Sequence, residues 1–156
     1  MIRFINPELY LDGSRAFNEL ILNYRAWFEK IPAAEPLAAV SVRVLGLFYN
    51  CFLITRQLEN CIDIPCFLSG TLKKSPTLFI QAKKHLIKIL ANRLKFMHDK
   101  NFLHGDLNLK NIVISNDSPE NLYFIDWDKS QIKTLLSDKD RNQNLTRLCR
   151  SMAKHN

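Results

Sequence analysis

Polar residues at fixed spacing between Met97 and Lys129 constrain the fold of this chain more than any other feature. A long segment with a regular apolar stripe leads into a loop that holds His104-Gly105-Asp106, and Asn111 follows this aspartate five residues later. Two short apolar runs come next, and Asp126 closely follows the second run. The pattern predicts a helix, a polar loop and a strand pair that deliver two carboxylates and a carboxamide to one point.

Oxygen ligands of this kind suit a magnesium ion, which binds one or two carboxylates together with the phosphates of a substrate. A carboxylate in a loop can also accept the proton of an attacking hydroxyl group. Phosphoryl transfer needs both, because metal ions neutralise the phosphates while a base orients the nucleophile. The residue types therefore indicate a phosphotransferase.

The arrangement resembles the catalytic lobe of the protein-kinase-like phosphotransferases. His104, Asp106 and Asn111 have the spacing of the kinase catalytic loop, and Asp126 stands where the metal-binding aspartate of the second motif stands. By this resemblance Asp106 is the catalytic base, and Asn111 and Asp126 bind Mg²⁺. Asn108 would approach the transferred phosphate, while His104 is expected to hold the loop backbone and not to act as a catalyst.

Three motifs narrow the resemblance to the lipopolysaccharide-core sugar kinases that act on 3-deoxy-D-manno-octulosonic acid (Kdo). They are Asp106-Leu107-Asn108-Leu109-Lys110-Asn111, Ile125-Asp126-Trp127-Asp128-Lys129 and Asn144-Leu145-x-Arg147-Leu148-x-Arg150-Ser151. Residues 14–19 and 47–55 are also similar to the region that precedes the catalytic lobe there. That family uses ATP to phosphorylate Kdo of lipid A–Kdo at the inner face of the inner membrane. The resemblance therefore implies ATP and Mg²⁺ as cofactors and a glycolipid substrate.

Helical and strand patterns are mixed along the chain without regular β-α-β alternation, which predicts the α+β class. The resemblance makes the fold protein-kinase-like, with residues 1–58 as a partial N-terminal lobe and residues 59–156 as the C-terminal lobe of one structural unit. Glu19 matches the glutamate of the N-lobe helix. The segment 55–58 would be the adenine-binding hinge, with nucleotide contacts from Thr55, Gln57 and Leu58.

Hydrophobic periodicity predicts two long helices and a basic final helix, and β-branched runs predict two antiparallel strand pairs. The long helices are expected at 14–30 and 77–99, and the strands at 40–44, 47–55, 111–115 and 122–125. Ser14 is the expected N-cap of the first helix, whose apolar stripe includes Phe17, Ile21, Tyr24 and Phe28. Prolines and a glycine make 60–76 a mixed segment. The final helix is expected to have Leu145, Leu148 and Met152 on its apolar side.

Two parts of a kinase nucleotide site are not found in the sequence as given. The four glycines, at positions 13, 46, 70 and 105, form no Gly-x-Gly-x-x-Gly, and no lysine precedes Lys30, which lies beyond Glu19. Kinases use such a loop and such a lysine to hold the phosphates. We therefore expect the first N-lobe strands to be absent, through a late start codon, a divided gene or a decayed one. We also expect the 156 residues to bind MgATP weakly.

Basic residues are concentrated in one segment. The chain carries a net charge of +7, and residues 71–100 hold eight basic residues and one acidic residue. Lys84, Lys88 and Lys95 fall on one helical face. Such a run is usually a solvated face, and attraction to an anionic glycolipid or membrane surface is the functional alternative. No stacking aromatics or nucleic-acid motif accompany the lysines, so we expect no nucleic-acid partner.

The cysteines and the hydropathy profile bear on the compartment. The cysteines have no C-x-x-C spacing and are expected to be reduced thiols in the core; they are Cys51, Cys61, Cys66 and Cys149. No uncharged apolar stretch reaches the about 20 residues of a bilayer span, and residues 1–13 form no secretory signal. These features predict a cytoplasmic protein, which the resemblance would place at the cytoplasmic face of the inner membrane.

Two alternatives stay open. The aminoglycoside and choline kinases are small-molecule phosphotransferases that also use His-Gly-Asp and Ile-Asp-Trp motifs. The second alternative is a non-catalytic pseudokinase remnant that keeps the glycolipid surface but does not turn over.

Overall fold

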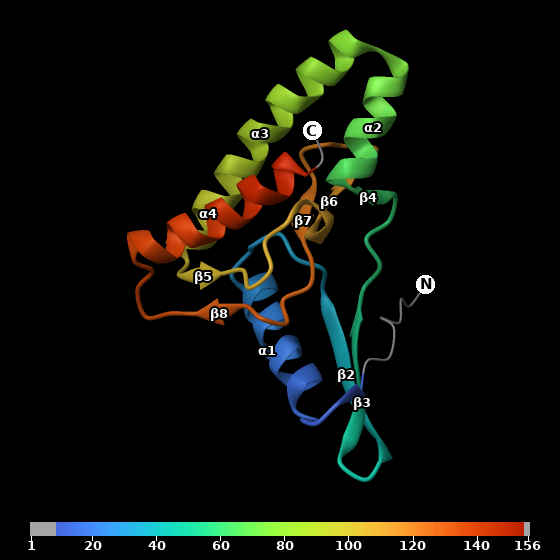
Figure 1. The fold of residues 1–156 in the computed structure, drawn as a ribbon, viewed down its shortest axis with the longest axis vertical. Coiled ribbons are helices and arrows are strands. Elements are labelled where there is room, and N and C mark those ends of the chain that lie inside the picture. Colours follow the sequence, from blue (N-terminus) through green and yellow to red (C-terminus); the bar gives the residue numbers. More distant parts are fainter. Residues whose placement is uncertain (1–8, 155–156) are drawn as a thin grey trace.

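The computed structural model describes residues 9–154, which form four α-helices, one 3₁₀ helix and eight short strands (Figure 1). The helices are α1 (Arg15–Phe28), α2 (Ile64–Lys74), α3 (Pro76–Asp99) and α4 (Asp138–Ala153), and the 3₁₀ helix is η1 (Leu109–Asn111). The strands are β1 (Leu9–Tyr10), β2 (Pro36–Leu45), β3 (Phe48–Thr55), β4 (Cys61–Asp63), β5 (Phe102–Leu103), β6 (Ile112–Ser115), β7 (Leu122–Phe124) and β8 (Gln131–Ile132). Residues 1–8 of the expected partial lobe lie outside the described residues.

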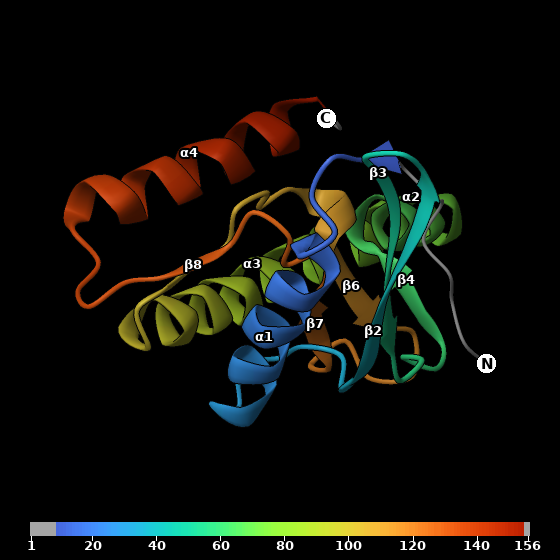
Figure 2. The ribbon, with the colours of Figure 1, turned by 90° about the horizontal axis from the view of Figure 1, so that it is seen from below.

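The amino-terminal part is an antiparallel sheet with strand order β1-β3-β2, against which α1 packs (Figures 1 and 2). The predicted strand pair is confirmed, although β2 begins earlier, at Pro36. Gly46 in the turn between β2 and β3 has a φ of +53°, a conformation that glycine adopts without strain. The first predicted helix is also confirmed as α1, which brings Glu19 to the inner side of the molecule.

The apolar stripe of α1 is not the buried face that amphipathicity predicted. Phe17, Ile21, Tyr24 and Phe28 are all exposed, whereas the buried residues of the helix are Ala16, Asn23 and Ala26. Small side chains let the helix approach its neighbours closely, so the larger apolar residues are turned outward. Ser14 occupies the N-cap position but makes no capping hydrogen bond, because its hydroxyl group donates to Asp12 Oδ2 at 2.7 Å.

The main hydrophobic core lies under α3. Leu86, Leu90, Leu94 and Met97 are buried at intervals of three and four residues, as the stripe predicted. They pack in one cluster with side chains of the β5, β6 and β7 region, among them Phe124 and Trp127. A second antiparallel sheet has the order β4-β6-β7, so the predicted strands at 111–115 and 122–125 are confirmed to within one residue.

The expectation of a mixed segment over 60–76 is wrong, because α2 occupies most of it. Asp63 caps this helix by accepting a hydrogen bond from the Cys66 amide at 2.7 Å, and Pro65 stands in the first turn, where proline is tolerated. Gly70 lies inside the helix, where it costs less than about 1 kcal/mol relative to alanine. The two prolines, Pro65 and Pro76, therefore marked the starts of α2 and α3 and not an irregular segment.

Two further burial expectations need correction. On α4, Leu148 is buried and Met152 half-buried, but Leu145 is exposed, because it faces away from the core-facing residues Asn144 and Leu148. All four cysteines are free thiols, yet none is a core residue: Cys51 and Cys61 are half-buried, and Cys66 and Cys149 are exposed. In the described part of the chain, no helix is both long enough and apolar enough to cross a bilayer.

Candidate active site

The loop between β5 and β6, residues 104–111, is the predicted catalytic loop and is called so below. It is built around His104, which is 1% exposed. Its Nδ1 accepts a hydrogen bond from the Asp106 amide at 3.2 Å, so the ring proton resides on Nε2. Nε2 then donates to the Ile125 carbonyl oxygen at 3.1 Å, and burial lowers the pKa of the imidazole to about 4. The ring is therefore neutral at pH 7. It links the loop to the end of β7, which is the scaffold role expected for it.

The structure brings together Asp106, Asn111 and Asp126, the three residues on which the sequence pattern centres. The Asn111 carboxamide donates to the Asp106 carbonyl oxygen at 2.9 Å, and its Nδ2 lies 3.5 Å from Asp106 Oδ2 and 3.3 Å from Asp126 Oδ2. The Ile125 amide donates to the Asn111 carbonyl oxygen at 3.0 Å. These contacts fix the carboxamide between the two carboxylates.

Asp126 follows β7 with a φ of +65°, in the left-handed region that aspartate tolerates better than most residues. Although the residue keeps access to solvent, partial burial raises the pKa of its carboxyl group, and the carboxylates of Asp128 and Asp106 raise it further. A divalent cation would relieve this excess of negative charge. The pair of Asn111 and Asp126 fits Mg²⁺, which keeps water or phosphate oxygens in its other positions. Among residues 9–154 no cluster of three or more His, Cys, Asp or Glu side chains is arranged to hold a metal ion.

An ion pair connects α1 to the segment after β7 that carries Asp126 and Asp128. Arg15 Nε donates to Asp128 Oδ1 at 2.8 Å, and the second arm of the guanidinium binds Asp128 Oδ2. Arg15 also lies over the ring of Tyr10, 3.9 Å from its centroid. The two partners of the ion pair are 113 residues apart in the chain, so no local sequence signal could have paired them. The contact holds α1 next to the strand end that carries Asp126.

Glu19 of α1 faces this same carboxylate-rich end. Burial raises the pKa of its carboxyl group to about 7, Asp126 and Asp128 raise it as well, and Arg15 and the Trp127 amide act in the opposite direction. The ion pairs found among the described residues do not include one between Glu19 and a lysine. Ionisation of the Glu19 carboxyl group is therefore less favourable in the folded protein than in water.

We expect Glu19→Gln to stabilise the protein above pH 7 and to have little effect at pH 5. The folded-state pKa is about 7 and the ordinary value is 4.5, so the wild-type chain loses stability as the pH rises through this window. The gain at pH 8.5 should be on the order of 1–3 kcal/mol. Urea unfolding in EDTA at both pH values measures it, with the exposed Glu120→Gln as control. An equal effect of Glu19→Gln at both pH values would contradict the assignment.

The predicted nucleotide-contact residues and Asn108 have local roles in this structure. Thr55 ends β3, and Gln57 and Leu58 lie in the segment between β3 and β4. The Asn108 carboxamide accepts from the Lys110 amide at 2.9 Å and donates to the Asp106 carbonyl oxygen at 3.1 Å, so it caps η1. Adenine contacts at 55–58 and a catalytic part for Asn108 stay predictions.

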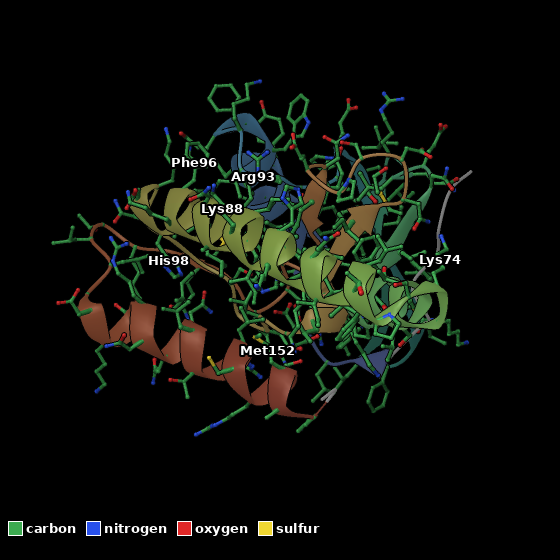
Figure 3. The ribbon with its side chains drawn as sticks, turned by 90° about the horizontal axis from the view of Figure 1, so that it is seen from above. Lys74, Lys88, Arg93, Phe96, His98 and Met152 are labelled. Atoms are coloured by element: carbon green, nitrogen blue, oxygen red, sulfur yellow. The ribbon has the colours of Figure 1, made fainter. Side chains whose placement is uncertain are left out.

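Sequence reasoning assigned no role to the face of α4 that holds the catalytic loop. Asn144 donates to the His104 carbonyl oxygen at 2.7 Å and accepts from buried His98 of α3 at 3.0 Å. Arg147 donates to the Gly105 carbonyl oxygen at 2.8 Å, and Ser151 accepts from the Leu109 amide at 3.1 Å. The spacing of these three α4 residues is the available signal, since offsets of three and four place them on one helical face. In Figure 3 the labelled His98 side chain lies between α3 and α4.

A solved structure described as "WaaP in complex with acyl carrier protein" superposes with a TM-score of 0.69 over 95% of this chain and 62% of that one, at 17% identity. The fold is therefore protein-kinase-like. Residues 8–156 match the lipopolysaccharide kinase (Kdo/WaaP) family, and the chain belongs to this family.

Curated relatives are named 3-deoxy-D-manno-octulosonic acid kinase. One from Haemophilus influenzae (strain 86-028NP) is 30% identical over 156 residues, which cover 96% of this chain and 60% of the relative. Another, from Vibrio cholerae, is 30% identical over 143 residues and is covered to 55%. The chain thus spans about 60% of the length of the curated relatives it matches.

Proposed function

We propose that the protein phosphorylates a hydroxyl group of Kdo in lipid A–Kdo with ATP as the phosphate donor. The observation that carries this proposal is the convergence of Asp106, Asn111 and Asp126 in a member of a lipopolysaccharide kinase family. We further propose that residues 1–58 belong to the nucleotide-binding lobe, with Glu19, Thr55, Gln57 and Leu58 on the nucleotide side. Residues 59–156 would carry the catalytic loop.

In the proposed reaction Asp106 accepts the proton of the sugar hydroxyl group, and the oxygen of that hydroxyl group attacks the γ-phosphorus of ATP. The bond from that phosphorus to the bridging oxygen breaks, and ADP leaves with the electron pair. A sugar phosphate monoester forms, and the proton passes from Asp106 to solvent. Mg²⁺ bound to Asn111 and Asp126 would supply charge neutralisation at the phosphates. Asn108 keeps the base in place through the Asp106 carbonyl oxygen and lies near the transferred group.

The charge around Asp106 favours an anionic acceptor over the small-molecule alternative. The cleft that opens beside Asp106 is lined by several lysines and arginines and by one acidic residue, Asp106 itself. Aminoglycosides and choline are cations, so such walls would repel them, whereas a phosphorylated sugar-acid lipid would be attracted.

The experiment is phosphate transfer from radiolabelled ATP by the 156-residue chain to purified Kdo–lipid A in the presence of Mg²⁺. Because the chain is expected to bind MgATP weakly, we expect label in the glycolipid only at high MgATP concentration, and none when Mg²⁺ is replaced by EDTA. Label on kanamycin or choline but not on the glycolipid would favour the small-molecule alternative. Absence of transfer to all acceptors would overturn the proposed activity for this chain.

We also propose that the turn between α2 and α3 contacts the anionic inner membrane surface from the cytoplasmic side. This turn forms one end of the molecule in Figure 1, and Leu72, Leu78 and Ile80 are about half exposed around it. Lys73 and Lys74 occupy the last turn of α2. Apolar side chains next to lysines favour an anionic lipid interface, where each lysine contributes about 1 kcal/mol.

Vesicle sedimentation tests this contact. We expect the chain to bind vesicles that contain phosphatidylglycerol more tightly than vesicles of phosphatidylcholine alone, and Leu72→Ser with Leu78→Ser to weaken binding by about tenfold. Ile21→Ser is the matched control, because Ile21 is an exposed apolar residue of α1. Loss of binding with the control and not with the double variant would place the contact on α1 instead.

A further inference from the structure

The cleft beside the catalytic loop is strongly positive. It has a volume of about 1520 Å³ and lies between the catalytic loop and α4. Its cationic lining residues are Lys110, Lys129, Lys139, Arg147, Arg150 and Lys154. Within residues 9–154, Arg147 is the one member of this set that takes part in an ion pair, and its partner is Asp106. The cleft therefore keeps a large excess of positive charge immediately next to the proposed base.

Arg147 lies where the cleft meets the proposed base, Asp106. Its Nη1 donates to the Gly105 carbonyl oxygen at 2.8 Å, and its Nη2 lies 3.0 Å from Asp106 Oδ1. Asn144, one turn earlier on α4, is buried and donates to the His104 carbonyl oxygen at 2.7 Å, which connects the helix to the loop. The side chain of Arg147 is nevertheless 52% exposed. A guanidinium has five N–H donors, and these two contacts leave donors available to a ligand.

We propose that Arg147 binds the carboxylate of the acceptor sugar and thereby makes the enzyme specific for an ulosonic acid. This inference rests on the proposed function, because it concerns the acceptor of the same site. The curated relatives are named for an octulosonic acid, a sugar whose carboxylate is attached to the same ring as its hydroxyl groups. With one hydroxyl group at Asp106, the carboxylate of the same ring would meet the guanidinium, whose Nη2 lies 3.0 Å from Asp106 Oδ1.

The chemistry of arginine suits this task better than that of the surrounding lysines. A guanidinium presents a planar pair of N–H groups that matches the two oxygens of a carboxylate, whereas an ammonium group is a point charge. The remaining cations of the cleft supply general electrostatic attraction for an anionic ligand. Arg147 would thus discriminate between sugar acids and neutral sugars, and it would orient the ring so that one hydroxyl group meets the base.

The test compares free Kdo with its carboxyl-reduced analogue by isothermal titration on the full 156-residue chain, without nucleotide. We expect the wild-type chain to bind Kdo at least about tenfold more tightly than the analogue. Arg147→Gln should bind the two sugars equally, and Arg147→Lys should recover only part of the preference. Arg93→Gln, an exposed arginine of α3, removes the same charge away from the cleft and should keep the full preference.

The outcomes separate this inference from the proposed function. Equal wild-type binding of both sugars, or an Arg147→Gln chain that keeps the preference, would overturn the carboxylate site even if phosphate transfer is observed. A preference that depends on Arg147, without any transfer from ATP, would support the carboxylate site and count against the activity. If Arg147→Gln does not fold, as judged by its thermal unfolding, Arg147→Lys decides through the same ratio: an unchanged preference would overturn the site.

Discussion

Asp106→Asn is expected to lower phosphate transfer to Kdo–lipid A by about 10²–10⁴-fold, because it removes the carboxylate that we propose as acceptor of the hydroxyl proton. Asparagine has nearly the same size, and its Oδ1 can still accept a hydrogen bond from Arg147, so the folded structure should be retained. Initial rates at saturating MgATP measure the effect, and thermal unfolding checks the fold.

The matched control is Asp117→Asn, which changes an exposed aspartate whose carboxylate accepts from Asn60 Nδ2 at 2.9 Å. Its transfer rate should stay within about twofold of wild type. An Asp106→Asn chain that transfers phosphate as fast as this control would require another base. If neither chain nor the wild type transfers phosphate, while all bind the glycolipid, the pseudokinase remnant becomes the better description.

Gly105→Ala is expected to be the most destabilising single-methyl change in the catalytic loop. A Cβ atom at this position would lie 2.0 Å from the carbonyl carbon and oxygen of Lys129, so one backbone segment would have to move. The Gly105 backbone is hydrogen-bonded at both of its polar groups. Its amide donates to Ser130 Oγ at 3.1 Å, and its carbonyl oxygen accepts from Arg147 at 2.8 Å. We expect a loss of at least about 3 kcal/mol, from overpacking and broken hydrogen bonds.

For a chain of this length such a loss lowers Tm by roughly 6–12 °C, which scanning calorimetry detects easily. Gly70→Ala is the matched control, because nothing lies within 4 Å of a Cβ built on Gly70 inside α2. It should leave Tm unchanged or raise it slightly through helix propensity. A Gly105→Ala chain that melts like this control would show that the loop tolerates a side chain there.

The convergence of Asp106, Asn111 and Asp126 could be predicted from the sequence because its signals are local. The interval from Asp106 to Asn111 spans one short loop, and the strand that ends before Asp126 pairs with the strand that follows Asn111. The polypeptide path therefore brings Asp106, Asn111 and Asp126 close to one another, while α4 holds the loop from outside. The long helix α3 was equally visible, since its buried stripe repeats every three or four residues.

Other features depend on packing between segments that are distant in the chain, and the sequence contains weaker signals for them. The apolar stripe of α1 identified the helix but not its buried face, which is made by small residues such as Ala16 and Ala26. The ion pair of Arg15 with Asp128 and the contact of Arg147 with Asp106 join segments far apart in the chain. The helix or motif that holds each of these residues could be predicted from the sequence, but the residue that each one contacts could not.

The dependence of the catalytic loop on α4 also sets an order of events during synthesis. Ribosomes make the loop at 104–111 before the helix at 138–153, yet Asn144, Arg147 and Ser151 hydrogen-bond to the loop from that later segment. A nascent chain that has emerged only as far as β8 therefore lacks these hydrogen bonds and the ion pair of Arg147 with Asp106. We expect an interrupted translation product of this length to carry the sequence motif without the contacts from α4 that complete the site.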